Sequence, residues 1–388
     1  VRTLTRVQPG SPVNCKENFS FGIEAEYLLV CTERYEPLWH DKLDSHSLES
    51  LLEGIPVNDL PSLNGLVSKS PSGEILPYYV EGYDVYDAAG QWHCVQPKGL
   101  ELRTPISHSI PDAVALFQRL QKRLANATSQ QGMSIVALSH HPTATRFNGE
   151  RQGRTRHRWK WAQEAMFNYA AHVNVSVPAS IRQSFDPNDF AAKVNHYGPA
   201  LTATSAASPL FAGAPWRCDR RYGRSRRIFR RCQVAPPFVY HPEQGHRLEF
   251  KAFDMSSSHE DFHQYLLLWL ALILDRQLPG RADQEAQVAA MQRAALDGLT
   301  DLELNARAME VLESAVDTLP RFGFDAEPLD DVARRVGQRR SRADDILDWL
   351  KSGFVLSDVL AALSVEPDAA VLADRIIDEP TLQDVKLA

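Results

Sequence analysis

Four short segments of the chain read as β-strands in which charged or polar residues alternate with apolar residues. Because successive side chains of a strand point to opposite faces, each segment would have one apolar and one polar face. If the four strands lie in one sheet, its polar face carries four carboxylates, one imidazole and two cations. Carboxylates this close repel one another unless cations offset their charge, which predicts a site for hard divalent cations. The segments are 22–27, 99–104, 172–177 and 247–252, and these side chains are Glu24, Glu26, Glu101, Arg103, His172, Glu249 and Lys251.

Each of these patterns is weak evidence when it is taken alone. A Glu-x-Glu pair such as Glu24 and Glu26 is usually a solvated strand face, and a single histidine such as His172 is more often hydrogen-bonded in a core. Four strands of matching polarity favour metal binding, because charges on half-buried strands are seldom placed without partners. Ligands rich in carboxylate and free of sulfur favour Mg²⁺ or Mn²⁺ over zinc. Asn174, on the same face as His172, is expected beside a metal ion or a phosphate.

The remaining periodicity predicts helices around this sheet. An apolar stripe over 111–131 predicts a helix that covers the outer, apolar face. Strands and helices do not alternate regularly, so we expect an α+β fold with a largely antiparallel sheet. We expect a catalytic domain over 1–275 and a helical region over 276–388 packed against it. The helices expected after Glu260 cover about 261–277, 282–297, 301–318, 328–338, 341–351 and 355–363.

Charge and composition narrow the classes of partner. A net charge of −7 and a pI near 6.0 argue against nucleic acid as the main ligand, because phosphate backbones require an excess of Lys and Arg. Two arginine-rich segments, 146–158 and 217–231, are nevertheless expected as loops beside the acidic strands. The longest apolar run, 266–274, is far shorter than the roughly 20 residues that span a bilayer. Five scattered cysteines and the absence of a signal-peptide pattern lead us to expect a cytoplasmic protein without disulfides. The sequence does not decide whether the protein forms a homo-oligomer.

The sequence lacks the common phosphate-binding and nucleophile motifs. It has no GxxxxGK[ST], no GxGxxG between a strand and a helix, and no GxSxG. Nucleotide phosphates would therefore be held by metal ions, by Lys251 and by arginines of the two segments. A substrate carboxylate would suit a bidentate guanidinium from the same segments. Without a protein nucleophile, we expect the reaction to pass through a substrate-borne intermediate.

Five motifs in consistent order resemble the glutamate–cysteine ligase family, which includes carboxylate–amine ligases, within the glutamine synthetase superfamily. FGIEAEYLLV, GLELRTP, AAHVNVSVP and RLEFKAFD resemble its metal-binding strands, and TSAASPLF resembles the segment before its substrate-binding arginine. The resemblance, which spans about residues 20–260, implies a glutamine synthetase-like active-site funnel. The implied metal ligands are Glu24, Glu26, Glu101, His172 and Glu249; Lys251 would face the nucleotide phosphates with Asn174 nearby, and Arg224 would bind the substrate carboxylate.

Two positions depart from the family's pattern. Lys251 stands where the family often has arginine, and Cys94 stands where the bacterial ligases have an acidic metal ligand. Glu81 or Asp84 would be the replacement for that ligand.

The resemblance implies an ATP- and Mg²⁺-dependent ligase that activates glutamate as an acyl phosphate and transfers it to cysteine or a related amino acid. Three alternatives stay open: a ligase with another acid or amine, a guanidino kinase, and a catalytically inactive relative that serves as a binding protein. The first two differ from the main prediction in their product, and the third differs in lacking ATP turnover.

Overall fold

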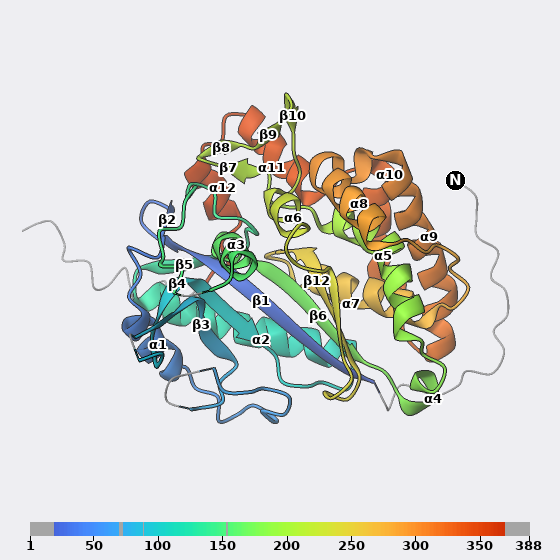
Figure 1. The fold of residues 1–388 in the computed structure, drawn as a ribbon, viewed down its shortest axis with the longest axis horizontal. Coiled ribbons are helices and arrows are strands. Elements are labelled where there is room, and N and C mark those ends of the chain that lie inside the picture. The colour runs from blue at the N-terminus through green and yellow to red at the C-terminus, as the bar shows by residue number, and fades with distance from the viewer. Residues whose placement is uncertain (1–18, 70–72, 88, 153, 369–388) are drawn as a thin grey trace, which may run out of the picture.

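The computed structural model describes residues 19–69, 73–87, 89–152 and 154–368, and its centre is one eight-stranded sheet (Figure 1). All strand pairs in this sheet are antiparallel. The four segments predicted to carry the polar face are four neighbouring strands, β12, β6, β1 and β4. The main order is β11 (Phe238–His241), β12 (Arg247–Asp254), β6 (Ala170–Ser176), β1 (Ser20–Cys31), β4 (Trp92–Arg103) and β3 (Tyr78–Tyr86), while β2 (Glu36–Pro37) and β5 (Met133–Val136) also pair with β1.

The apolar face of the sheet is closed by two long helices, α2 (Ile110–Gln130) and α7 (His259–Leu274). Strand residues such as Ile23, Val173 and Leu248 are at most 1% exposed on this face. Their burial removes apolar surface from water, which is the main favourable term in folding. Figure 1 shows α2 crossing behind β1 and β4, as expected for the helix predicted over 111–131.

The polar face is covered by two short helices that lie partly within the segments predicted as loops, 146–158 and 217–231. Residues 156–165 form α3 (Arg156–Ala165), and residues 226–231 form α6 (Arg226–Arg231). For 156–158 and 226–231 the loop prediction was wrong, because apolar residues such as Trp159 and Ile228 give each short helix a packed side despite the density of arginine. A hydrogen bond of 2.6 Å from Arg230 Nε to Glu164 Oε2 joins the two helices. Two small ribbons precede α6 in the chain, formed by β7 (Leu210–Phe211) with β8 (Ala214–Pro215) and by β9 (Arg217–Cys218) with β10 (Arg221–Tyr222).

Of the C-terminal helices, α8 (Gln284–Asp297), α9 (Leu302–Thr318) and α10 (Asp330–Gln338) pack beside the sheet at the right of Figure 1, whereas α11 (Arg342–Lys351) and α12 (Leu356–Ala362) lie at its top, near β7 and β8. All six predicted helices after Glu260 are present within about three residues of their expected bounds. They pack partly on α5 (Pro187–Ser205). This helix was not predicted, because Gly198 and Pro199 interrupt its helical sequence pattern. The division at residue 275 stays a prediction. The remaining helices are α1 (Ser45–Glu53) and α4 (Ala179–Arg182).

The apolar run 266–274 lies within α7 and is buried in the core. Among the residues that the structure describes, no helix has both the length and the apolar character needed to cross a membrane. Cys31, Cys94, Cys218 and Cys232 are free thiols, whereas Cys15 lies outside the described residues.

Candidate active site

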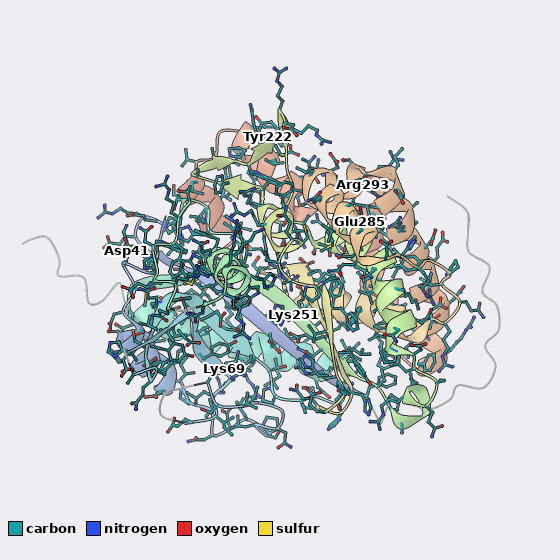
Figure 2. All side chains as sticks on the ribbon, viewed as in Figure 1. Asp41, Lys69, Tyr222, Lys251, Glu285 and Arg293 are labelled. Atoms are coloured by element: carbon teal, nitrogen blue, oxygen red, sulfur yellow. The ribbon has the colours of Figure 1, made fainter. Side chains whose placement is uncertain are left out.

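A cavity of about 350 Å³ lies between the polar face of the sheet and the helices α3 and α6. Its floor is formed by side chains of β1, β3, β4, β6 and β12, and Arg227 and Arg231 of α6 enter it from above. Figure 2 labels two of its lysines, Lys69 and Lys251, which both lie over the open face of the sheet. The charged lining residues are Glu24, Glu26, Glu81, Glu101, Glu164, Lys69, Lys98, Lys251, Arg227 and Arg231, together with His172.

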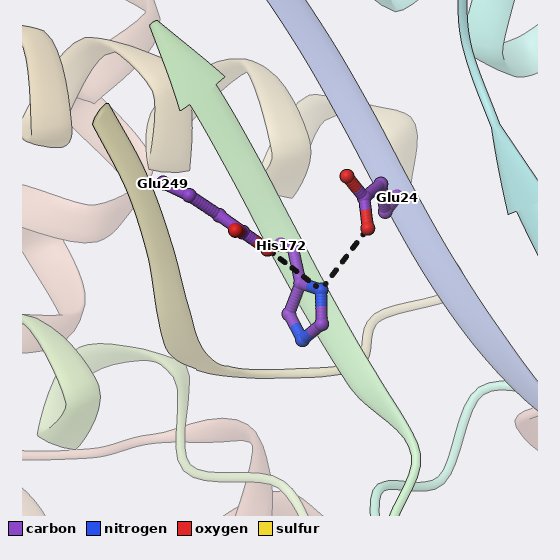
Figure 3. Close-up of side chains that lie close together, drawn as sticks. All are labelled: Glu24, His172 and Glu249. Carbon is purple, nitrogen blue, oxygen red and sulfur yellow. Dashed lines mark hydrogen bonds and ion pairs between the residues drawn. The ribbon is translucent and has the colours of Figure 1, made fainter. Parts of the chain in front are cut away.

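One set of possible metal ligands at this face of the sheet consists of Glu24, His172 and Glu249, from three adjacent strands. Glu24 lies directly opposite His172 in the pairing of β1 with β6. His172 Nδ1 lies 3.4 Å from Glu24 Oε2 and 3.5 Å from Glu249 Oε1, as Figure 3 shows. Each residue offers one ligand atom within 4.8 Å of the others, which is close enough to share one metal ion. We call this set the first triad.

Cations surround the first triad on the side of β12. Lys251 Nζ lies 3.0 Å from Glu249 Oε1, and an Arg247 guanidinium nitrogen lies 3.3 Å from Glu249 Oε2. Burial raises the pKa of the Glu24 carboxyl, but the hydrogen bond and charge of His172 and the charges of Lys251 and Arg247 outweigh burial and lower it overall. The pKa of His172 is lowered by burial and by Lys251. The pKa values of Glu24 and His172 are both lowered, so both shifts favour the deprotonated forms, which are the forms that bind metal.

A second set of possible metal ligands, which we call the second triad, consists of the three carboxylates of Glu26, Glu81 and Glu101. Glu26 and Glu101 lie directly opposite each other on β1 and β4, and like charges in that position repel. Burial, together with the charges of Glu24 and Glu26, raises the pKa of Glu101 well above its usual range, although Lys69 opposes this shift. The Glu101 Oε1 atom is buried without a hydrogen-bond partner. A buried, unpaired carboxylate oxygen beside two further carboxylates fits a bound cation.

Lys98 supplies a cation to the second triad and was missed in the sequence. Its Nζ lies 2.6 Å from Glu26 Oε2 and 3.6 Å from Glu81 Oε1, and it donates to the carbonyl oxygens of Asn168 and Ala165 at 2.6 and 3.1 Å. Strict alternation along β4 places Lys98 on the apolar face with Leu100. The pairing with β3 shifts between Glu81 and Gly82, and this bulge changes the direction of the Lys98 side chain.

The structure brings most of the predicted site residues together and leaves one outside. Asn174 donates to Glu24 Oε1 at 3.2 Å, and Lys251 lines the cavity. Arg224, predicted to bind a substrate carboxylate, instead forms an ion pair with Asp344 of α11 at 2.7 Å and does not line the cavity. Two other arginines of the same segment, Arg227 and Arg231, point into it. The predicted metal and nucleotide ligands that the structure brings together are Glu24, Glu26, Glu101, His172, Glu249, Asn174 and Lys251.

The residue that takes the place of the missing acidic ligand can be read from the geometry. Cys94 pairs with Val85 near the far end of β4 and does not line the cavity. Asp84 accepts a hydrogen bond from Trp92 Nε1 at 3.2 Å and also lies outside the cavity. Glu81 is the candidate that joins Glu26 and Glu101.

The fold of this chain is similar to that of two solved ligases. The bifunctional glutathione synthetase of Pasteurella multocida has a TM-score of 0.57 and 15% identity, over 90% of this chain and 52% of that one. The glutamate–cysteine ligase of Francisella tularensis, solved in complex with AMP, has a TM-score of 0.56 and 14% identity, over 92% of this chain and 91% of that one. These similarities confirm the predicted fold class.

The chain belongs to glutamate–cysteine ligase family 2, whose family model matches residues 20–246. This result confirms the family that the five motifs predicted. A protein of Rubrobacter xylanophilus, provisionally named glutamate–cysteine ligase 2-1, is 26% identical over 121 residues, which are 29% of this chain and 31% of the relative. The match therefore spans less than a third of the length of this curated relative.

Proposed function

We propose that the protein is an ATP-dependent carboxylate–amine ligase that forms a γ-glutamyl amide from glutamate and an amino acid or other amine. The observation that carries this proposal is the pair of triads on one face of the sheet, five of whose six residues line the same cavity, with Lys251 and Arg247 beside the first triad. Family membership and the AMP complex of the Francisella tularensis ligase support the choice of nucleotide.

The side chains divide by charge into three roles. The first triad would hold one Mg²⁺ or Mn²⁺ ion, and the second triad would hold another. When bound, these ions would offset the negative charge of the phosphoryl group during transfer. Lys251 and Arg247 would bind phosphate oxygens. Arg231, which has a buried guanidinium nitrogen without a hydrogen-bond partner, would bind a carboxylate of the acid substrate.

The reaction can proceed without a protein nucleophile. A γ-carboxylate oxygen of glutamate attacks the γ-phosphorus of ATP; the bond from that phosphorus to the bridging oxygen breaks, releasing ADP. The nitrogen of the neutral amine then attacks the acyl carbon, and the carbon–oxygen bond to phosphate breaks. The proton lost by the nitrogen leaves with the phosphate as hydrogen phosphate. The cavity residues contribute by holding both reactants in place, which lowers the entropic cost of each step.

Among the alternatives, the inactive relative is disfavoured by Glu81. The reason to consider an inactive relative is Cys94, which stands where an acidic metal ligand is expected. Glu81 brings a third carboxylate to the second triad, so the second triad does not lack an acidic ligand. A guanidino kinase would give a stable phosphorylated product rather than an amide, so product mass separates it from a ligase.

The test is ADP release from MgATP and glutamate, with amines supplied one at a time and the product identified by mass. A glutamyl amide would support the ligase. Glu24→Gln and Glu249→Gln variants should release no ADP, whereas Glu36→Gln, which removes an exposed partner of Lys42, should match the wild type. If no acid and amine pair gave ADP while the protein still bound MgATP, the ligase proposal would fail in favour of a binding protein.

A further inference from the structure

A second cavity of about 640 Å³ opens beside the second triad, at the β3 edge of the sheet. It joins the first cavity through residues that line both, among them Tyr79, Glu81 and Lys98. Its walls are mainly aromatic and aliphatic, with Tyr83 and Trp92 from β3 and β4 and Trp161 from α3. Cavities of about this size hold ligands much larger than a single small amino acid.

The aromatic walls are partly open to solvent. Trp161 is 50% exposed and Trp92 is 39% exposed, although both line the cavity. Polar groups at the rim fix two of the rings: the Arg154 guanidinium lies 4.2 Å from the centre of the Tyr83 ring, and Asp84 accepts from Trp92 Nε1 at 3.2 Å. Large exposed aromatic side chains gathered around a hollow mark a site for an apolar ligand.

The distribution of cations decides which substrate would enter this cavity. Arg247 and Lys251, the cations beside the first triad, lie on β12, next to the β11 edge of the sheet. The second cavity lies at the opposite edge, on β3, and three cations line it as well. Each of them is already engaged: Lys98 with Glu26 and Glu81, Lys69 with the ring of Tyr79, and Arg154 with the ring of Tyr83. The triphosphate of ATP would therefore bind near β12. The second cavity, near β3, would then be available to the amine that reacts with the activated acid.

We propose that the second cavity binds the acceptor amine and that this acceptor is a primary amine carrying an aromatic ring. This proposal rests on the proposed ligase function and names its second substrate class. The ring packs against Tyr83, Trp92 and Trp161, and the amine points toward Glu81, which lines both cavities. An acceptor as small as cysteine would leave most of the aromatic wall exposed to water.

The experiment measures ADP release from MgATP and glutamate with 2-phenylethylamine, phenylalanine, methylamine and cysteine as acceptors. We expect kcat/KM for the aromatic amines to exceed that for the small amines at least tenfold, the usual range for apolar pocket contacts. Trp92→Ala should lower kcat/KM for 2-phenylethylamine about tenfold and leave the value for methylamine unchanged. The matched control is Tyr86→Ala, because Tyr86 pairs directly with Trp92 and is 42% exposed but is not among the residues that line the cavity.

Two outcomes would overturn the proposal directly, and a third would leave the decision to a binding measurement. Faster turnover with cysteine than with either aromatic amine would reject the acceptor class while leaving the ligase intact. A rise in KM for ATP in Trp92→Ala, with amine kinetics unchanged, would assign the cavity to the adenine ring. If no amine supported ADP release, the proposed ligase function would be rejected, and calorimetry with 2-phenylethylamine would test the second cavity separately. Binding that is lost in Trp92→Ala would support an aromatic-amine site in this cavity. The absence of binding to the wild type would reject that site.

Discussion

The ion pair between Arg227 of α6 and Asp254 of β12 makes the sharpest stability prediction. Arg227 is 1% exposed and Asp254 is fully buried, and their charged atoms lie 3.4 Å apart. Arg227 also donates to the carbonyl oxygens of Phe253 and Lys251 at 3.0 and 2.7 Å, so it ties α6 to β12, the strand that carries Glu249 of the first triad. Asp254 accepts from Ala207 N and Ser208 Oγ at 2.9 and 2.7 Å.

Arg227→Met would leave the Asp254 carboxylate buried without a cation. Removing one partner of a buried pair costs about 3–5 kcal/mol, because the remaining charge is uncompensated. The double variant Arg227→Met/Asp254→Asn should recover part of this loss, since the introduced amide would carry no charge and its side-chain oxygen could still accept from Ala207 N. The two single variants and the double variant therefore form a cycle whose coupling energy reports the pair.

The assay is urea unfolding followed by tryptophan fluorescence, with the free energy of unfolding taken by linear extrapolation. The matched control is Arg221→Met, which removes an exposed ion pair with Asp297 and should cost at most about 1 kcal/mol. A loss below about 1 kcal/mol for Arg227→Met, equal to the control, would refute the reasoning from burial.

Further predictions concern the site and the sheet. Glu81→Gln should weaken Mn²⁺ binding in titration calorimetry and lower ADP release, whereas Cys94→Ala should leave both unchanged; the reverse result would show that Glu81 does not replace the missing ligand. Adding Mg²⁺ should raise the melting temperature of the wild type by mass action and raise it less in Glu24→Gln, and equal shifts would remove the first triad as a metal site. Gly99→Ala should lower the melting temperature, because its added Cβ would lie 2.0 Å from the Tyr27 carbonyl oxygen. Gly337→Ala in α10, where the added Cβ meets open space, should raise the free energy of unfolding by about 0.5–1 kcal/mol. A Gly99→Ala protein as stable as the wild type would contradict the close approach of β1 and β4.

The sequence predicted those parts of the site that follow strict alternation along a strand. Glu24, Glu101, His172 and Glu249 obey that period, and their strands are neighbours in the sheet. Alternation does not reveal strand order, so the division into two triads could not be predicted. Lys98 was missed because a bulge breaks the period, a feature set by pairing with β3 rather than by the local sequence.

The arginine-rich segment 217–231 shows a second limit of sequence reasoning. Its eight arginines are indistinguishable in composition, and their roles depend on whether each lies in α6 or before it, and on which side of the helix. Arg227 and Arg231 are one turn apart and share a face that points into the cavity. Arg224 precedes the helix and turns to α11, an element more than a hundred residues away in sequence. A contact so distant in sequence leaves no local pattern to read.

The burial of the cations explains why the two triads differ in character. Lys251 and Arg247 keep 29% and 23% of their side chains exposed, so each can exchange a glutamate partner for another anion at little cost in desolvation. Lys98 keeps only 4% exposed and is fixed by two carbonyl oxygens as well as by Glu26 and Glu81. Moving it would leave buried polar groups without partners, which is costly. Lys98 is therefore held beside the second triad whether or not a ligand is bound, while the cations of the first triad are available to an incoming anion.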